Sequence, residues 1–108
     1  MTELEYIFVT RFTRHEMIEK VNSNLESFKE AIDIALSDKV PLGWRAAWIL
    51  GHCTQRRDDQ IIPYADELIA AIKDKKDGHQ RELIKLLIKL DLNEDQEGRL
   101  FDICLTIW

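Results

Sequence analysis

The sequence predicts an all-α protein in which antiparallel helix pairs stack into a short α–α superhelix. Three observations lead to this fold class. Only 4 glycines and 2 prolines interrupt the 108 residues. Apolar residues recur mostly at spacings of three and four, the pattern of a helix with one buried face. The second half of the chain also repeats the first at an offset of 36 residues, for example from Phe28 to Tyr64, which lies in the range of tandem helical repeats.

Composition limits the classes of function. The length fits a single domain, residues 1–108, and 45% hydrophobic with 32% charged residues is ordinary for a globular protein. A net charge of -5, from 20 acidic and 15 basic side chains, disfavours a nucleic-acid partner, because phosphate binding normally needs a basic face. No apolar run approaches the roughly 18–20 residues that span a bilayer, so no membrane partner is expected.

The N-terminus and the cysteines favour a cytoplasmic location. Acidic residues stand near the start, where a signal peptide would carry lysine or arginine. Cys53 and Cys104 lie far apart and form no CxxC pattern. Thiols in a reducing compartment are therefore favoured over a disulfide.

Helix start signals mark the order of the elements. Three pairs fit the S/T-x-x-E capping box, namely Thr2 with Glu5, Thr13 with Glu16, and Ser23 with Glu26. Pro41 and Pro63 suit a first helical turn, where no amide bond is lost. Asn93 is a good N-cap, followed by acids that suit the positive end of a helix dipole. The predicted helices are 3–12, 14–22, 24–37, 42–56, 62–75, 79–91 and 94–108.

The internal repeat organises the chain into units. Matching positions at the 36-residue offset are Phe28 with Tyr64, Ile32 with Leu68, Ala35 with Ala71, Leu50 with Leu86, Asp38 with Asp74, and Arg45 with Arg81. One further step places Leu100, Cys104, Ile107 and Trp108 at the apolar positions of a first helix. The predicted division is an N-terminal helical preface at 1–22, a first repeat at 24–57, a second repeat at 62–91 and a terminal half repeat at 94–108.

Two segments carry a family resemblance. Residues 44–51, WRAAWILG, resemble the second helix of a HEAT repeat, and residues 80–87, QRELIKLL, are a weaker copy. The resemblance covers about residues 24–108 and implies a HEAT-like superhelix that usually serves protein–protein contacts. Asp38 and Asp74 in the turns, with Arg45 and Arg81 in the second helices, resemble the polar ladder of that family. We expect each turn carboxylate near the next arginine, since a guanidinium at a helix seam needs several acceptors.

No catalytic, cofactor or metal site is predicted. His15, His52 and His79 fall in different elements and none forms the i, i+4 pair of helical metal ligands. His52 adjoins Cys53, but neighbouring helix residues diverge by about 100°. Gly-rich phosphate loops and GxSxG are absent from the sequence. The enzyme class therefore has no positive support.

The second helices supply the candidate binding face. Trp44 and Trp48 lie one turn apart beside Ala47 and Gly51, which favours a core seam between repeats over a base-stacking platform. By resemblance, second helices line the concave side of the superhelix. The residues there that the core does not require are expected to contact a partner, with a merely solvated face as the equal alternative. They are Ile49, Cys53, Arg56, Arg57, Glu82, Lys85 and Lys89.

The last helix suggests a second contact surface. Residues 98–108 are apolar on nearly every side, as expected for a helix covered on two faces. Phe101, Leu105 and Trp108 are candidates for a terminal interface with another copy, giving a homodimer, or with another partner; a shortened form of a longer repeat protein is the alternative. The predicted function is a non-catalytic protein-interaction or scaffolding module. A nucleic-acid-binding or repair-type HEAT protein and an accessory enzyme subunit remain alternatives.

Overall fold

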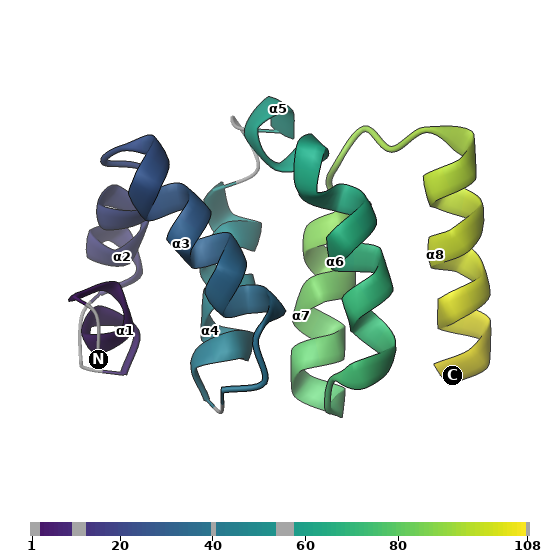
Figure 1. The fold of residues 1–108 in the computed structure, drawn as a ribbon, viewed down its shortest axis with the longest axis horizontal. Helices are drawn as coiled ribbons and strands as arrows, with labels where there is room; N and C mark the ends of the chain where they lie inside the picture. Colours follow the sequence, from purple (N-terminus) through teal and green to yellow (C-terminus); the bar gives the residue numbers. More distant parts are fainter. Residues whose placement is uncertain (1–2, 10–12, 40, 54–57, 108) are drawn as a thin grey trace.

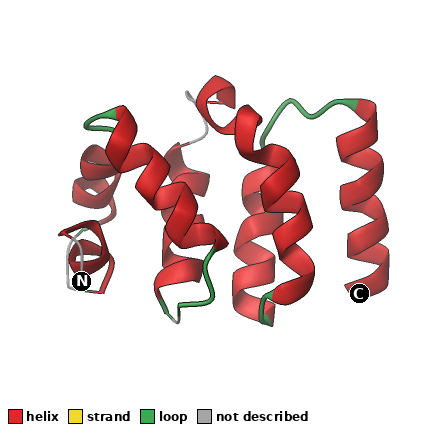
Figure 2. Cartoon of the chain, viewed as in Figure 1, coloured by secondary structure: helices red, strands yellow, loops and turns green. Residues whose placement is uncertain are grey.

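The computed structural model describes residues 3–9, 13–39, 41–53 and 58–107, and all regular structure within these ranges is helical (Figure 2). The all-α prediction is confirmed. The α-helices are α1 (Glu3–Val9), α2 (Arg14–Val21), α3 (Leu25–Leu36), α4 (Leu42–Cys53), α5 (Asp58–Ile61), α6 (Ala65–Ala71), α7 (Asp77–Ile88) and α8 (Glu94–Ile107). Two short 3₁₀ helices, η2 (Ile62–Tyr64) and η3 (Ile72–Asp74), flank α6.

Local capping explains where several helices begin. Thr13 forms the expected capping box, with Glu16 N donating to Thr13 Oγ1 at 3.1 Å and Thr13 N donating to Glu16 Oε1 at 3.2 Å. The box predicted at Ser23 is wrong. Asn24 caps α3 instead, because its Oδ1 accepts from Ser27 N at 2.7 Å, while the Ser23 hydroxyl donates to Lys20 O. Thr2 lies outside the described residues.

The helices follow one another along the long axis of the molecule, whose extents are 35 × 26 × 19 Å (Figure 1). α3 pairs with α4, α6 pairs with α7, and α4 packs extensively on α7. The helices α1 and α2 lie at one end, and α8 lies at the other. Because α4 also contacts α1 and α2, it is the most surrounded helix of the fold.

A continuous apolar core joins the two helix pairs. Ile32 and Leu50 of the first pair and Leu68 and Leu86 of the second are all fully buried. These residues occupy matching places at the 36-residue offset, so the repeat in the sequence corresponds to a repeat in packing. Trp48 is half-buried and packs against this core.

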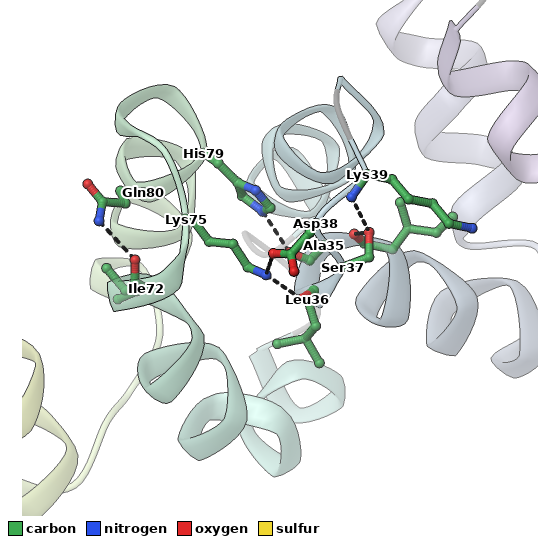
Figure 3. Close-up of polar contacts among 10 residues, drawn as sticks. Ala35, Leu36, Ser37, Asp38, Lys39, Ile72, Lys75, His79 and Gln80 are labelled. Carbon is green, nitrogen blue, oxygen red and sulfur yellow. Dashed lines mark hydrogen bonds and ion pairs between the residues drawn. The ribbon is translucent and has the colours of Figure 1, made fainter.

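Polar contacts fix how the second pair sits on the first (Figure 3). Lys75 Nζ donates to Leu36 O and to Asp38 Oδ1, both at 2.7 Å. The Nε2 atom of His79 lies 2.7 Å from Ala35 O. These bonds satisfy carbonyls at the C-terminal end of α3, which its own helix leaves unbonded. The turn of one pair is therefore tied to the turn of the next.

The expected pairing of Asp38 with Arg45 is wrong. Asp38 is taken by Lys75, and hydrogen bonding to this ammonium lowers the pKa of the carboxyl. Arg45 Nη1 instead donates to Phe8 O at 2.7 Å, which anchors the end of α1 to α4. A carbonyl at a helix end can also accept a hydrogen bond from a guanidinium, so the sequence spacing did not decide the acceptor.

Candidate protein-interaction surface

The face predicted on α4 is only partly accessible. Ile49 has no exposed surface and Cys53 is also buried, so their assignment to an open binding face is wrong. The physical reason is the position of α4, which is surrounded by α1, α2, α3 and α7. Most side chains of a helix in this position are buried against its neighbours. Arg56 and Arg57 lie outside the described residues.

The predicted residues on α7 lie at or near the surface. Lys85 is exposed, and its Nζ lies 3.4 Å from Oε1 of the half-buried Glu82. Lys89 Nζ donates to Gly51 O at 2.9 Å. This bond joins the end of α7 to the end of α4, where a cation is favoured by the negative end of a helix dipole.

An apolar groove on α4 was missed by the sequence analysis. It holds about 160 Å³ and is lined by Met17 of α2 and by Trp44, Arg45 and Trp48 of α4. We call these four residues the tryptophan groove. Trp44 is 38% exposed, so its assignment to the core seam is wrong, while Trp48 contributes to both core and groove.

Helical spacing explains the groove. Ala46, Ala47, Ile49 and Leu50 are fully buried in α4. Trp44 and Trp48 lie one turn apart on the side of the helix that faces away from Ala46 and Leu50. One signal in the sequence could have indicated this exposed side of α4. The polar residues Arg45 and His52 lie on the same side of the helix as the two tryptophans.

Neighbouring side chains hold the two indoles in place. The Arg45 guanidinium carbon lies 5.7 Å from the centre of the Trp44 ring, a cation–π arrangement. The rings of Trp48 and His52 meet edge to face, with centres 5.0 Å apart and planes at 84°. Both indoles are therefore ordered before any ligand arrives.

Direct contacts place cations at the groove and at the end of α4. Arg45 lines the groove, and Lys89 Nζ bonds to Gly51 O. Burial lowers the pKa of His52, and the nearby charges of Arg14 and Lys89 lower it further, while Glu82 opposes them. We call this surface the tryptophan face. It comprises the tryptophan groove and His52, with Arg14, Lys85 and Lys89 as cations and Glu82 as a carboxylate.

The sequence matches the family description "HEAT repeat domain" over residues 8–107. The chain belongs to the HEAT repeat family. Comparison with curated proteins and with solved structures finds no significant match for either. The family match confirms the resemblance inferred from the second helices.

A cavity of about 420 Å³, lined mostly by charged residues together with Trp44, lies at the turn end of the HEAT domain. Its walls include Lys39 and Lys75, and both ammonium groups have acceptors. Lys39 Nζ lies 2.8 Å from Glu5 Oε2, and Lys75 bonds to Asp38. His79 also lines the cavity, and burial lowers its pKa, while its bond to the Ala35 carbonyl opposes that shift. We assign these groups to holding the turns together.

The terminal helix of the HEAT domain is covered on one face. Leu100 and Ile103 are buried, and α8 contacts α6 and η3. Phe101 and Leu105 are 62% and 65% exposed. Coverage of the second face of α8 by a partner stays a prediction. Trp108 lies outside the described residues, so its place in the predicted terminal interface stays a prediction.

Neither bilayer-crossing nor metal-binding features occur in the part of the chain that the structure describes. No helix there is long and apolar enough to cross a membrane. No group of three or more His, Cys, Asp or Glu side chains there is arranged to hold a metal ion.

Proposed function

We propose that this HEAT domain is a non-catalytic protein-interaction module that binds a partner segment on the tryptophan face. Proteins of this repeat family commonly mediate interactions and are generally non-catalytic. The observation that carries the proposal is the open tryptophan groove beside cationic side chains. Tryptophan and arginine are the residues that most often dominate binding energy at protein interfaces.

The chemistry of the face indicates the kind of segment that it binds. An apolar side chain of the partner would enter the groove between Met17 and the two indoles. Acidic residues on either side of that anchor would face Arg14, Lys85 and Lys89. Because contacts with Arg45 and His52 already order the indoles, binding costs less side-chain entropy. The opposite charge of the segment would also speed its encounter with the face.

Affinity capture with matched surface variants tests this function. Trp44→Ser removes one wall of the groove, and Leu25→Ser removes a more exposed apolar side chain from α3. Proteins bound by the native chain and by Leu25→Ser should coincide in quantitative mass spectrometry. The same proteins should be lost with Trp44→Ser and, at moderate salt, with Lys85→Glu. Identical capture by all four chains would reject the tryptophan face.

A nucleic-acid ligand is the second candidate, favoured only by the exposed Trp44 ring beside cations, an arrangement that can stack a base. The net charge of -5 argues against it. A gel shift with single-stranded and duplex DNA at low and high salt separates the two candidates. We expect no shift. A salt-sensitive shift that is lost in Trp44→Ser would replace the protein partner with a nucleic acid.

Two further expectations remain proposals. A role as an accessory subunit of an enzyme would use the same face, so affinity capture would reveal it through the identity of the partner. A cytoplasmic location is supported by Cys53 and Cys104, which are both thiols, buried and half-buried respectively. Fractionation of cells that express the tagged chain tests the location.

A further inference from the structure

The helix α8 corresponds in the repeat to α3 and α6, the first helices of their pairs. By the 36-residue offset, Cys104 corresponds to Ile32 and Leu68, which are fully buried between the helices of their pairs. Cys104 is half-buried and lines an open groove. The groove therefore lies where the second helix of a third helix pair would pack.

The groove is apolar, holds about 310 Å³ and lies between the end of α7 and α8. Its lining includes Leu87, Ile88, Leu92, Leu100, Phe101 and Cys104. Ile88 is 67% exposed, and Phe101 and Leu105 are exposed to a similar degree. Apolar side chains gathered in this way are typical of an interaction site and are uncommon on a surface that stays in water. We call this groove the α7–α8 seat.

Charge around the seat selects the occupant. Residues 91–107 contain five acids against the single base Arg99, and Glu97 lines the groove itself. Arg99 is already paired, with Asp66 at 2.6 Å and Asp95 at 3.0 Å. Glu97 is the single charged residue among those that line the groove, so the rim is negative at this position. A second copy that packed α8 against α8 would bring these acids together, which like-charge repulsion opposes.

We propose that the α7–α8 seat binds an amphipathic helix of a partner protein, with an apolar stripe flanked by lysine and arginine. The stripe would cover Ile88, Phe101 and Leu105, and the basic flanks would face the acidic rim. Such a helix would complete the third pair in the way that α7 completes the second. This surface is lined by different residues from the tryptophan face and prefers the opposite charge, so either proposal can fail alone.

Two synthetic helical peptides test the proposal. Both carry the same leucine stripe over 18 residues, one with lysine flanks and one with glutamate flanks, and each bears a fluorescent label. Fluorescence anisotropy with the intact chain should show saturable binding of the lysine peptide. The glutamate peptide should bind at least about tenfold more weakly, since close like charges at an interface are unfavourable.

Variants then separate seating in the groove from general attraction between opposite charges. Phe101→Asp should weaken the lysine peptide at least about tenfold, as loss of a central aromatic anchor does, although it adds negative charge. General attraction predicts the reverse. Glu97→Lys should also weaken binding, while Tyr6→Asp, at an exposed site on α1, and Trp44→Ser should leave it unchanged. Circular dichroism would verify that each variant is folded.

Three outcomes would overturn the proposal: absence of saturable binding, equal affinity for the two peptides, or binding unchanged in Phe101→Asp. Sedimentation at tens of micromolar addresses the homodimer expected from the sequence. We expect a monomer. A dimer that Phe101→Asp dissociates would assign the seat to a second copy of the chain.

Discussion

The contact between Gly43 of α4 and His79 of α7 sets how closely the two second helices approach. A Cβ atom at position 43 would lie 2.5 Å from Cε1 and 3.0 Å from Nδ1 of the imidazole. The ring cannot simply move away, because Nε2 is bonded to Ala35 O at 2.7 Å. Only glycine fits here without displacing a group that also ties α7 to α3.

Gly43→Ala should therefore destabilise the protein, although alanine favours a helix. We expect a loss of about 1–3 kcal/mol in the free energy of unfolding, the usual cost of overpacking. Gly98 is the matched control, since it lies in α8 with nothing within 4 Å of its Cβ position. Gly98→Ala should stabilise by roughly 0.5–1 kcal/mol. Urea unfolding measures both, and equal effects at the two sites would refute the close approach.

Ile49 and Ile88 provide a second matched pair, because one isoleucine is fully buried in α4 and the other is 67% exposed at the end of α7. Ile49→Ala should cost about 2–5 kcal/mol through lost burial and the cavity left behind. Ile88→Ala should change stability by no more than about 0.5 kcal/mol. Thermal and urea unfolding would contradict the burial pattern if the two variants melted alike.

The same residues show what the sequence could predict at this scale. The 36-residue offset matched Leu50 with Leu86, and both are fully buried. Periodicity failed for Ile49 and Trp44. A helix covered from several directions has apolar residues on nearly every side. The spacing alone could therefore not show which side of α4 remains exposed to solvent. That side is determined by the packing of α1 and α2, which are distant in sequence.

Among the elements, α8 depends most on a few polar contacts. Asn93 and Gln96 cap its start reciprocally, with Gln96 N donating to Asn93 Oδ1 at 2.8 Å and Asn93 N donating to Gln96 Oε1 at 3.1 Å. The Nε2 atom of the buried Gln96 side chain also donates to Asp66 Oδ1 at 3.1 Å. One side chain thus caps α8 and attaches it to α6.

Gln96→Ala should loosen α8 before the rest of the molecule. The loss of a cap and of a hydrogen bond to a carboxylate is expected to cost about 1–2 kcal/mol. Hydrogen exchange followed by mass spectrometry should show faster exchange in α8, with little change in α4. Arg99→Gln is the control, because its exposed ion pairs contribute at most about 1 kcal/mol. Uniform acceleration along the chain would mean that α8 opens only with the whole protein.

Prediction of the elements succeeded where a cap or a repeat specified them. Asn93 correctly marked the start of α8. At the 36-residue offset, residues of α3 and α4 fall on residues of α6 and α7. The predicted helix at 62–75 is three consecutive elements, η2, α6 and η3. Pro63 contributes to this interruption, since it lacks an amide donor. The sequence did not show how far the 3₁₀ turns would extend, because the two helix types share similar backbone angles.

Across the whole molecule, burial of histidines makes stability depend on pH. Burial lowers the pKa of both His52 and His79 from the ordinary value of 6.5. The unfolded chain therefore binds more protons than the folded one as the pH falls through 6.5, and the folded state loses stability. Asp38 and Asp66 have lowered pKa values through bonds to Lys75 and Arg99. Their contribution is kept above an ordinary pKa of 3.8 and is lost only in stronger acid.

The free energy of unfolding should accordingly fall between pH 7.5 and pH 5.5, well before the carboxylates titrate. His79→Gln tests the cause, since glutamine can still donate to the Ala35 carbonyl but cannot take up a proton. The quantity to compare is the slope of the free energy of unfolding against pH. This slope should be smaller for the variant than for the native chain. His15→Gln, at an exposed site on α2, should keep the native slope. If urea unfolding gave all three chains the same slope, the buried imidazole between the two helix pairs would not be the group that senses pH.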